Sequence, residues 1–242
     1  MKATFVGGCH LVGKPHGVSA GFVRKLWKRW RSLDRNVHFE MIPYAVQWTA
    51  LFDACLEGLK KEPDFLVLNI QSGLVLPTWD RTMKRLGIKK EDQANATENW
   101  FAPIEWKPQS RGHFYWRAKR LGILALGGHK EKWTWIEKEW GKLAQEFSKS
   151  KTRVIIMTPT PVKDEFFVRG IANLERVCEM VLTYEDDYEV YDAYVAVKGL
   201  GNLGLWLDGQ HISREAHILI ADQLWSLIYE KGEYPCRPEN KQ

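Results

Sequence analysis

Two short runs of continuous apolar residues place the tightest limit on the fold of this chain. Residues 64–70 (DFLVLNI) and 153–158 (RVIIMT) lack the polar–apolar alternation of a half-exposed strand. Such runs are typical of strands buried on both faces, as in a parallel sheet with helices on each side. They predict an α/β protein whose sheet forms the central layer.

Three further β-rich runs, at residues 3–8, 37–42 and 189–197, bring the predicted sheet to five strands. Between the runs, apolar residues recur every three or four positions over residues 22–30, 50–59, 133–147 and 213–228, which predicts amphipathic helices. Ser213 is a suitable N-cap for the last of these helices. The alternation of strands and helices predicts a five-stranded parallel sheet in a three-layer α/β/α sandwich.

A longer segment, residues 76–129, interrupts this alternation. It contains Pro77, Pro103 and Pro108 together with many aromatic and basic residues. A connection of this length usually carries helices of its own and often covers an active site. We expect a helical insertion after the third strand that caps the site, within one domain spanning residues 1–242.

The composition excludes several classes of protein. Hydrophobic residues make up 45% of the chain and charged residues 27%, as in soluble globular proteins rather than disordered or fibrous ones. No apolar run reaches the roughly 18 residues of a membrane-spanning helix. The first 14 residues fit a first strand better than a signal peptide. We therefore expect no integral membrane segment and a cytoplasmic location.

Cysteine spacing and net charge narrow the range of ligands. Cys9, Cys55, Cys178 and Cys236 lie far apart, which favours reduced thiols over a zinc site. No group of histidine, aspartate and glutamate residues has the spacing of metal ligands, so we expect neither a metal nor a bound cofactor. The net charge is 35 − 30 = +5 without a cationic tail, and a nucleic-acid partner is not expected.

Three short motifs fall where strands end or where the last helix begins. GGCH at residues 7–10 follows the first strand, NIQSG at 69–73 ends the third, and DGQH at 208–211 precedes the last helix. In open parallel sheets, ligands bind at the carboxyl ends of the strands. We expect the three motifs to form one site.

Cys9 is the candidate nucleophile of this site. Gly7 and Gly8 permit a sharp turn with backbone N–H groups facing an oxyanion, and a helix starting after the turn would favour the thiolate of Cys9. The alternative is a small buried cysteine under a glycine turn. His10 either assists at the site or orients the turn, and the second role is preferred because neighbouring residues on a strand point in opposite directions.

Asp208 and His211 are the candidate orienting acid and base. A carboxylate three residues before an imidazole can accept its Nδ1–H bond and leave Nε2 facing a nucleophile, which is the division of roles in a catalytic triad. Alternatively, Asp208 shapes a turn and His211 lies on the surface. His217, six residues further on, is expected on another face of the last helix.

These motifs resemble the SGNH (GDSL-type) hydrolases. GGC after the first strand and LDGQHIS before the last helix resemble the first and last blocks of that family, and PDFLVLNIQSG (63–73) resembles its third block. The resemblance implies a flavodoxin-like α/β/α fold and acyl-transfer chemistry on esters. It places Cys9 at the position of the family's serine, as in a cysteine-bearing branch linked with acyl transfer to polysaccharides.

The resemblance also implies an oxyanion hole. Gly8 or Cys9 would contribute a backbone N–H and Gln71 a side-chain amide, with Ser72 and Asn69 as alternatives to Gln71. Residues 44–47 lack the glycine expected in the second block. A thiol nucleophile suits a thioester donor, which makes acyl-CoA a candidate co-substrate and a saccharide or other small acyl ester the substrate.

Two other functions compete with the enzyme. The chain could be an inactive carbohydrate- or ligand-binding protein with the same fold, or a nucleic-acid binder because of its charge. A basic run, Arg24, Lys25, Lys28, Arg29 and Arg31, has two interpretations as well: a surface for phosphate groups or an acidic membrane, or an ordinary solvated helix face. The sequence does not indicate an oligomeric state.

Overall fold

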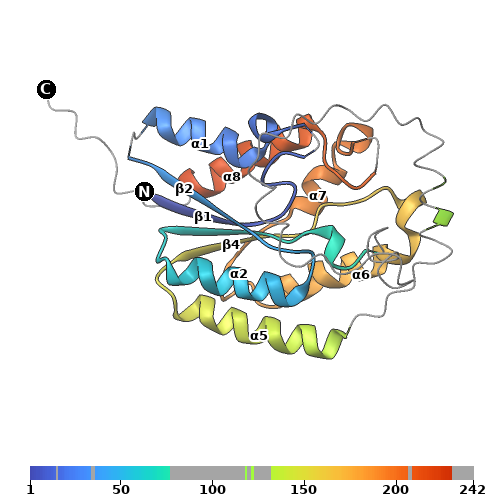
Figure 1. Ribbon diagram of the computed structural model, residues 1–242, viewed down its shortest axis with the longest axis horizontal. Coiled ribbons are helices and arrows are strands. Elements are labelled where there is room, and N and C mark those ends of the chain that lie inside the picture. The colour runs from blue at the N-terminus through green and yellow to red at the C-terminus, as the bar shows by residue number, and fades with distance from the viewer. Residues whose placement is uncertain are drawn as a thin grey trace, which may run out of the picture.

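The computed structural model describes residues 1–14, 16–33, 36–76, 118, 121–122, 132–206 and 209–230. Five parallel strands form one sheet in the order β2-β1-β3-β4-β5 (Figure 1). The strands are β1 (Lys2–Gly7), β2 (His38–Pro43), β3 (Phe65–Asn69), β4 (Arg153–Met157) and β5 (Glu189–Tyr191). The predicted five-stranded parallel sheet is confirmed.

Helices cover both faces of the sheet, as Figure 1 shows. α1 (Phe22–Leu33), α7 (Ala193–Lys198) and α8 (Arg214–Glu230) lie on one face. On the other face lie α2 (Trp48–Lys60), α5 (Trp133–Lys149) and α6 (Asp164–Leu182). Short 3₁₀ turns are η1 (Val18–Ala20), η2 (Ser72–Leu74) and η4 (Gly201–Leu203). The predicted three-layer sandwich is confirmed.

The central strands are buried on both faces, as their apolar runs predict. Along β3, Phe65 and Val67 pack toward α1 and α8, whereas Leu66 and Leu68 pack toward α2 and α5. Every residue of β3 is buried. Each face of the sheet therefore has its own apolar core. Successive residues of β3 contribute to the two cores in turn, because successive side chains of a pleated strand point to opposite faces.

The chain adds β2 on one side of β1 and β3 on the other side, so the order of strand addition reverses at β1. From β1 the chain passes through α1 to β2, and it then returns through α2, on the opposite face, to β3. Phe5 pairs with Val67 and Val6 with Leu68, so β1 and β3 end at the same level. This is the switch point at which an open parallel sheet binds its ligands.

The predicted fifth strand is wrong beyond Tyr191. The Asp192 carboxylate accepts the N–H of Val195 at 3.0 Å and starts α7 one residue later. An aspartate at an N-cap satisfies a free helical N–H and overrides the strand preference of the following valine and tyrosine residues. Ser213 caps α8 as expected, with its hydroxyl accepting the N–H of Ala216 at 3.0 Å.

Besides α7, the helix α6 has no counterpart in the prediction. α6 packs Leu174, Val177 and Val181 against the sheet, and this spacing of three and four residues was available in the sequence.

The predicted insertion over residues 76–129 lies outside the described residues except for Leu76, Ala118, Leu121 and Gly122. Its helices and its position over the site stay predictions. Within the described ranges, no helix has both the length and the hydropathy needed to cross a bilayer.

Candidate active site

The turn after β1 carries the candidate nucleophile. The N–H of Leu11 donates to the carbonyl of Gly8 at 3.0 Å, and that of Lys14 donates to the carbonyl of Cys9 at 3.1 Å. These bonds fold residues 8–14 into consecutive turns, and the first α-helix begins only at Phe22. The expectation that Cys9 lies at a helix N-terminus is therefore wrong, and a helix dipole does not act on it.

Cys9 differs from the other described thiols in its position beside Gly8 and His10, at the predicted site. Its side chain is half-buried. Burial raises the pKa of the Cys55 thiol, and burial together with the charge of Asp192 raises the pKa of Cys178 to about 12. Both groups are thus neutral thiols near neutral pH, and neither adjoins the predicted site residues. Cys236 lies outside the described residues.

The side chain of Gln71 lies directly over Gly8. A Cβ atom added to Gly8 would come within 1.8 Å of the Gln71 amide carbon and 2.0 Å of its oxygen and nitrogen. The Gly8 φ angle lies outside the left-handed region, so glycine is required here by the close approach and not by backbone conformation. The structure brings together Gly8 and Gln71, the two groups expected at the oxyanion hole.

Tyr44 holds this amide in place, a role that the sequence analysis missed. Its hydroxyl donates to the carbonyl of Asn69 at 3.0 Å and accepts the backbone N–H of Gln71 at 3.0 Å. The Gln71 side-chain amide in turn donates to the Tyr44 carbonyl at 3.4 Å. Tyr44 is almost fully buried, and burial raises its pKa, so the phenol stays protonated as a donor. The sequence could have indicated this role, because Tyr44 directly follows β2 and the carboxyl ends of neighbouring parallel strands lie at the same edge of the sheet.

Ser72 and Asn69 lie deeper than Gln71. Ser72 is buried at the start of η2, where its carbonyl accepts the N–H groups of Val75 and Leu76 at 3.2 and 3.1 Å. Asn69 is fully buried at the end of β3. Gln71 thus lies over Gly8, and Asn69 lies beside Gly7, where an added Cβ would come within 3.0 Å of the Asn69 Cβ.

The loop before α8 brings His211 to the same edge. Its backbone is tied by the N–H of Trp206, which donates to the His211 carbonyl at 2.8 Å, and by a bridge between Leu205 and Ile212. The Gln210 side chain reaches toward η2, where its Nε2 lies 3.6 Å from the position of a Cβ on Gly73. Segments far apart in the sequence therefore converge here. Asp208 lies outside the described residues, and its orienting role stays a prediction.

Four histidines form a cluster beside this convergence. The rings of His10 and His211 meet edge to face with centroids 5.9 Å apart, and His10 and His217 do so at 6.4 Å. His16 meets His217 at 6.4 Å. The expectation that His217 faces elsewhere is wrong, because His211 precedes α8 and helical spacing does not relate the two residues. His10 lies on a turn, not on a strand, so it can lie beside His211.

Burial keeps the inner imidazoles neutral. It lowers the pKa of His217 well below its usual value, and the neighbouring His10 and His16 lower it further. Burial also lowers the pKa of His16. Within the described part of the chain, no three or more histidine, cysteine or acidic side chains are arranged to hold a metal ion.

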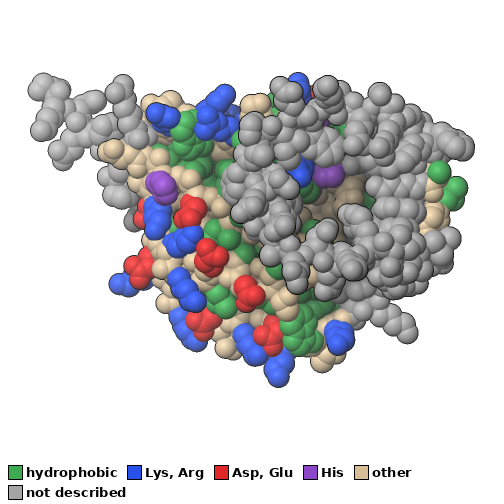
Figure 2. All heavy atoms as spheres, in the orientation of Figure 1, with side chains coloured by type: hydrophobic (Ala, Val, Ile, Leu, Met, Phe, Trp, Pro, Cys, Tyr) green, Lys and Arg blue, Asp and Glu red, His purple; other side chains and the backbone are tan. Residues whose placement is uncertain are grey.

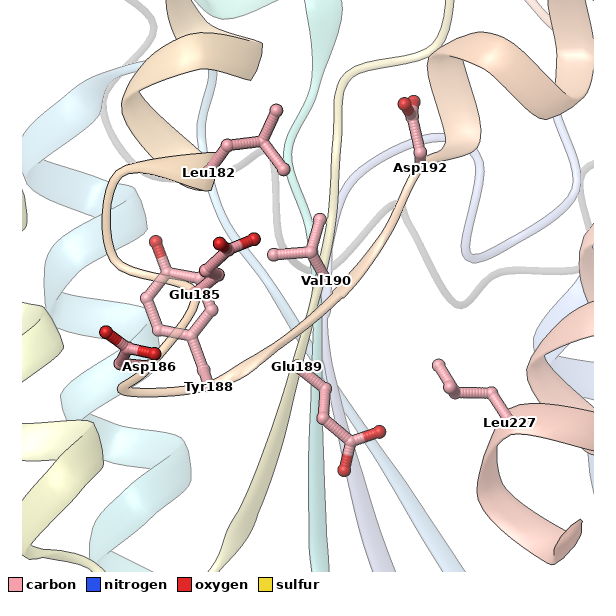
Figure 3. Close-up of a pocket in the computed structure, with 8 residues that line it drawn as sticks. All are labelled: Leu182, Glu185, Asp186, Tyr188, Glu189, Val190, Asp192 and Leu227. Carbon is pink, nitrogen blue, oxygen red and sulfur yellow. The ribbon is translucent and has the colours of Figure 1, made fainter. Parts of the chain in front are cut away.

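A hollow of about 500 Å³ lies at the edge strand β5 and is lined by Glu185, Asp186 and Glu189, among others (Figure 3). Glu189 accepts bonds from the guanidinium of Arg153, and Asp192, also at the hollow, caps α7. Two of its four carboxylates thus have structural roles. The hollow contains none of the predicted site residues.

Comparison with known proteins identifies the fold. No protein-family model and no curated protein sequence matches the chain. A member of the lipolytic protein G-D-S-L family from Veillonella parvula DSM 2008 matches in structure with a TM-score of 0.55 at 12% identity, over 96% of this chain and 100% of that one. The acetyl xylan esterase AlAXEase matches at 0.58 and 13%, over 94% and 100%.

A lipase/acylhydrolase from Enterococcus faecalis matches with a TM-score of 0.54 at 15% identity, over 94% of this chain and 95% of that one. At such identities the likeness shows the fold alone. The chain has the fold of SGNH hydrolases, as the sequence motifs predict.

Proposed function

We propose that this chain is an acyl-transfer enzyme that uses Cys9, His211 and Asp208 on esters or thioesters. The observation that carries the proposal is the meeting of His10 and His211, with ring centroids 5.9 Å apart, at the edge where β1 delivers Cys9. The half-exposed thiol, the Gln71 amide over Gly8 and the hydrolase fold support it further.

In this mechanism the Cys9 sulfur attacks the acyl carbonyl after its proton has passed to His211. The tetrahedral oxyanion accepts hydrogen bonds from a backbone N–H of Gly8 or Cys9 and from the Gln71 amide. His211 then returns the proton to the leaving alcohol or thiol, and an acyl-Cys9 thioester remains. Water or a sugar hydroxyl, deprotonated by His211, releases the acyl group and restores the thiol. No bound cofactor takes part.

Two considerations narrow the substrate. The acyl-enzyme is a thioester, so exchange with an acyl-CoA donor is close to thermoneutral, whereas a plain ester would have to form a bond of higher energy. The acetyl xylan esterases among the structural neighbours favour an acetylated saccharide as the ester. We therefore propose acyl-CoA as a donor, and a saccharide or another small acyl ester as acceptor or substrate.

The test combines turnover with detection of the acyl-enzyme. Wild-type protein should hydrolyse an aryl acetate or acetyl-CoA, and intact-mass spectrometry after acid quench should find one acetyl group on Cys9. Cys9→Ala should abolish both signals. Cys178→Ala is the matched control, because that thiol is half-buried but lies outside the site, and it should leave the rate unchanged. Full activity in Cys9→Ala would contradict the proposal.

The alternative is a ligand-binding protein without turnover. The absence of a glycine at residues 44–47, where Tyr44 is buried instead, motivates it. Equal binding of an acetylated oligosaccharide by wild type and Cys9→Ala, with no product released by either, would establish this second function.

A further inference from the structure

The outer face of α1 concentrates positive charge. The first 33 residues contain no aspartate or glutamate and seven basic residues: Lys2, Lys14, Arg24, Lys25, Lys28, Arg29 and Arg31. On α1, Phe22, Leu26 and Trp30 are buried against the sheet and α8. Arg24, Lys28 and Arg31 are exposed on the opposite side, spaced by four and three residues.

An indole ring holds two of these cations together. The guanidinium carbon of Arg24 lies 3.9 Å from the centroid of the Trp27 ring, and that of Arg31 lies 4.8 Å from it. Contacts of this kind are cation–π interactions. They keep two positive charges close to each other instead of letting the side chains spread into solvent. We call Arg24, Trp27, Lys28 and Arg31 the α1 basic face.

No carboxylate in the described part of the chain forms an ion pair with the α1 basic face. Arg29 pairs with Asp222 of α8, but Arg24, Lys28 and Arg31 form no ion pair with any described residue. On α5 the pattern is the opposite, since Lys142 pairs with Glu139 at 2.7 Å and Lys149 with Glu146 at 2.8 Å. Figure 2 shows the contrast: acidic and basic side chains alternate over the lower part of the molecule, whereas basic side chains lie beside hydrophobic ones along the upper left, over α1.

Two apolar side chains are exposed near the C-terminal ends of α1 and α8, on the side of α1 that packs against α8. Leu33, at the end of α1, is 60% exposed. Tyr229 of α8 is 47% exposed and stacks on Trp225, with centroids 5.3 Å apart. Trp225 in turn packs on Trp30 of α1 at 4.9 Å. On the basic face itself, the aromatic ring of Trp27 is flanked by long basic side chains, and this combination is typical of surfaces that rest at a membrane–water interface.

We propose that the α1 basic face binds the surface of an anionic lipid bilayer. The positive charge of this face complements the lipid phosphates, and the Trp27 ring lies among the basic side chains that would contact them. A nucleic acid fits less well, because two guanidiniums already lie over the Trp27 ring, where a base would have to stack. The chain would thus work at a membrane surface.

Co-sedimentation of the full chain with lipid vesicles tests this proposal. Wild type should bind phosphatidylcholine vesicles that contain about a third phosphatidylglycerol, and it should not bind pure phosphatidylcholine. In the triple variant Arg24→Gln, Lys28→Gln, Arg31→Gln, the partition coefficient should fall by about 100-fold, since each basic residue near such a surface contributes about five-fold. Added salt should weaken wild-type binding.

A matched control separates the surface from the net charge. The variant Lys138→Gln, Lys142→Gln, Lys149→Gln alters exposed residues of α5, and like the α1 variant it lowers the net charge from +5 to +2. It should bind within a few-fold of wild type. Equal losses in both variants would overturn the proposal, as would absence of wild-type binding to anionic vesicles. Tighter binding to an oligonucleotide duplex than to vesicles would also overturn it.

Discussion

Replacing Gly8 with alanine tests the arrangement of the site most directly. The new methyl carbon would lie 1.8 Å from the Gln71 amide carbon, whereas two non-bonded carbons are stable at about 3.5 Å or more. The amide must therefore retreat by roughly 1.5 Å or more. That movement breaks its 3.4 Å bond to the Tyr44 carbonyl and removes it from the proposed oxyanion position.

Two measurable costs follow from this displacement. Overpacking of a buried contact lowers the free energy of unfolding by about 1–3 kcal/mol. Loss of one oxyanion donor lowers kcat by about 10²–10³-fold. Urea unfolding measures the first cost, and initial rates of aryl acetate hydrolysis at saturating substrate measure the second.

Gly199→Ala is the control for a glycine-to-alanine change. Gly199 ends α7 with φ −61° and ψ −22°, and its added Cβ would meet its nearest atoms at 3.4 Å. This backbone suits alanine, so stability should stay the same or rise by about 0.4–1 kcal/mol, with kcat unchanged.

A double variant identifies the cause. If Gly8→Ala acts by displacing the amide, then in a Gln71→Ala background it should cost little further activity, because the amide is already gone. Additive losses would refute the reasoning. Full activity and full stability of Gly8→Ala would refute the contact itself.

Three other predictions test the site and its surroundings. Tyr44→Phe should lower the free energy of unfolding by about 1–3 kcal/mol in urea titrations and reduce kcat, because the buried N–H of Gln71 loses its acceptor; an unchanged unfolding curve would contradict this. The stability contributed by neutral His217 should be fully present above pH 6.5, the usual pKa of histidine, and should fall below it with a slope of up to about 1.4 kcal/mol per pH unit, since the folded pKa is lowered and the unfolded chain binds the proton first. His217→Phe should flatten that slope in thermal unfolding curves recorded from pH 7 to pH 5. Iodoacetamide should modify half-buried Cys9 faster than fully buried Cys55, as peptide mass spectrometry would show, and equal rates would argue against an accessible nucleophile.

Periodicity and run length were sufficient to predict the architecture. The continuous apolar runs became β3 and β4, and the amphipathic stripes became α1, α2, α5 and α8. The prediction failed where a local cap competed with strand propensity, since Asp192 starts α7 inside a run of valine, tyrosine and alanine. A hydrogen bond of one side chain decides such a boundary, and a pattern of hydrophobicity does not contain it.

The rule for parallel sheets predicted which segments of the chain meet at the candidate site. It assigned the segments of Cys9, Gln71 and His211 to one edge because strand ends of a parallel sheet meet there. It did not reveal that Gln71 lies on Gly8, or that Tyr44 ties the ends of β2 and β3 together. Nor did it reveal the packing of His10 and His217.

The amino-acid sequence by itself thus determined the layers, the parallel sheet and the segments that lie at its edge. The spacing of apolar residues and the residue types at turns are local properties of the chain, so they can be read without the structure. Only the tertiary structure decided which side chains touch. Gln71 and Gly8 are 71 − 8 = 63 positions apart in the sequence. The histidine pairs that touch are at least 211 − 10 = 201 positions apart. These contacts depend on sub-ångström positions of packed elements, and close packing sets those positions for the molecule as a whole.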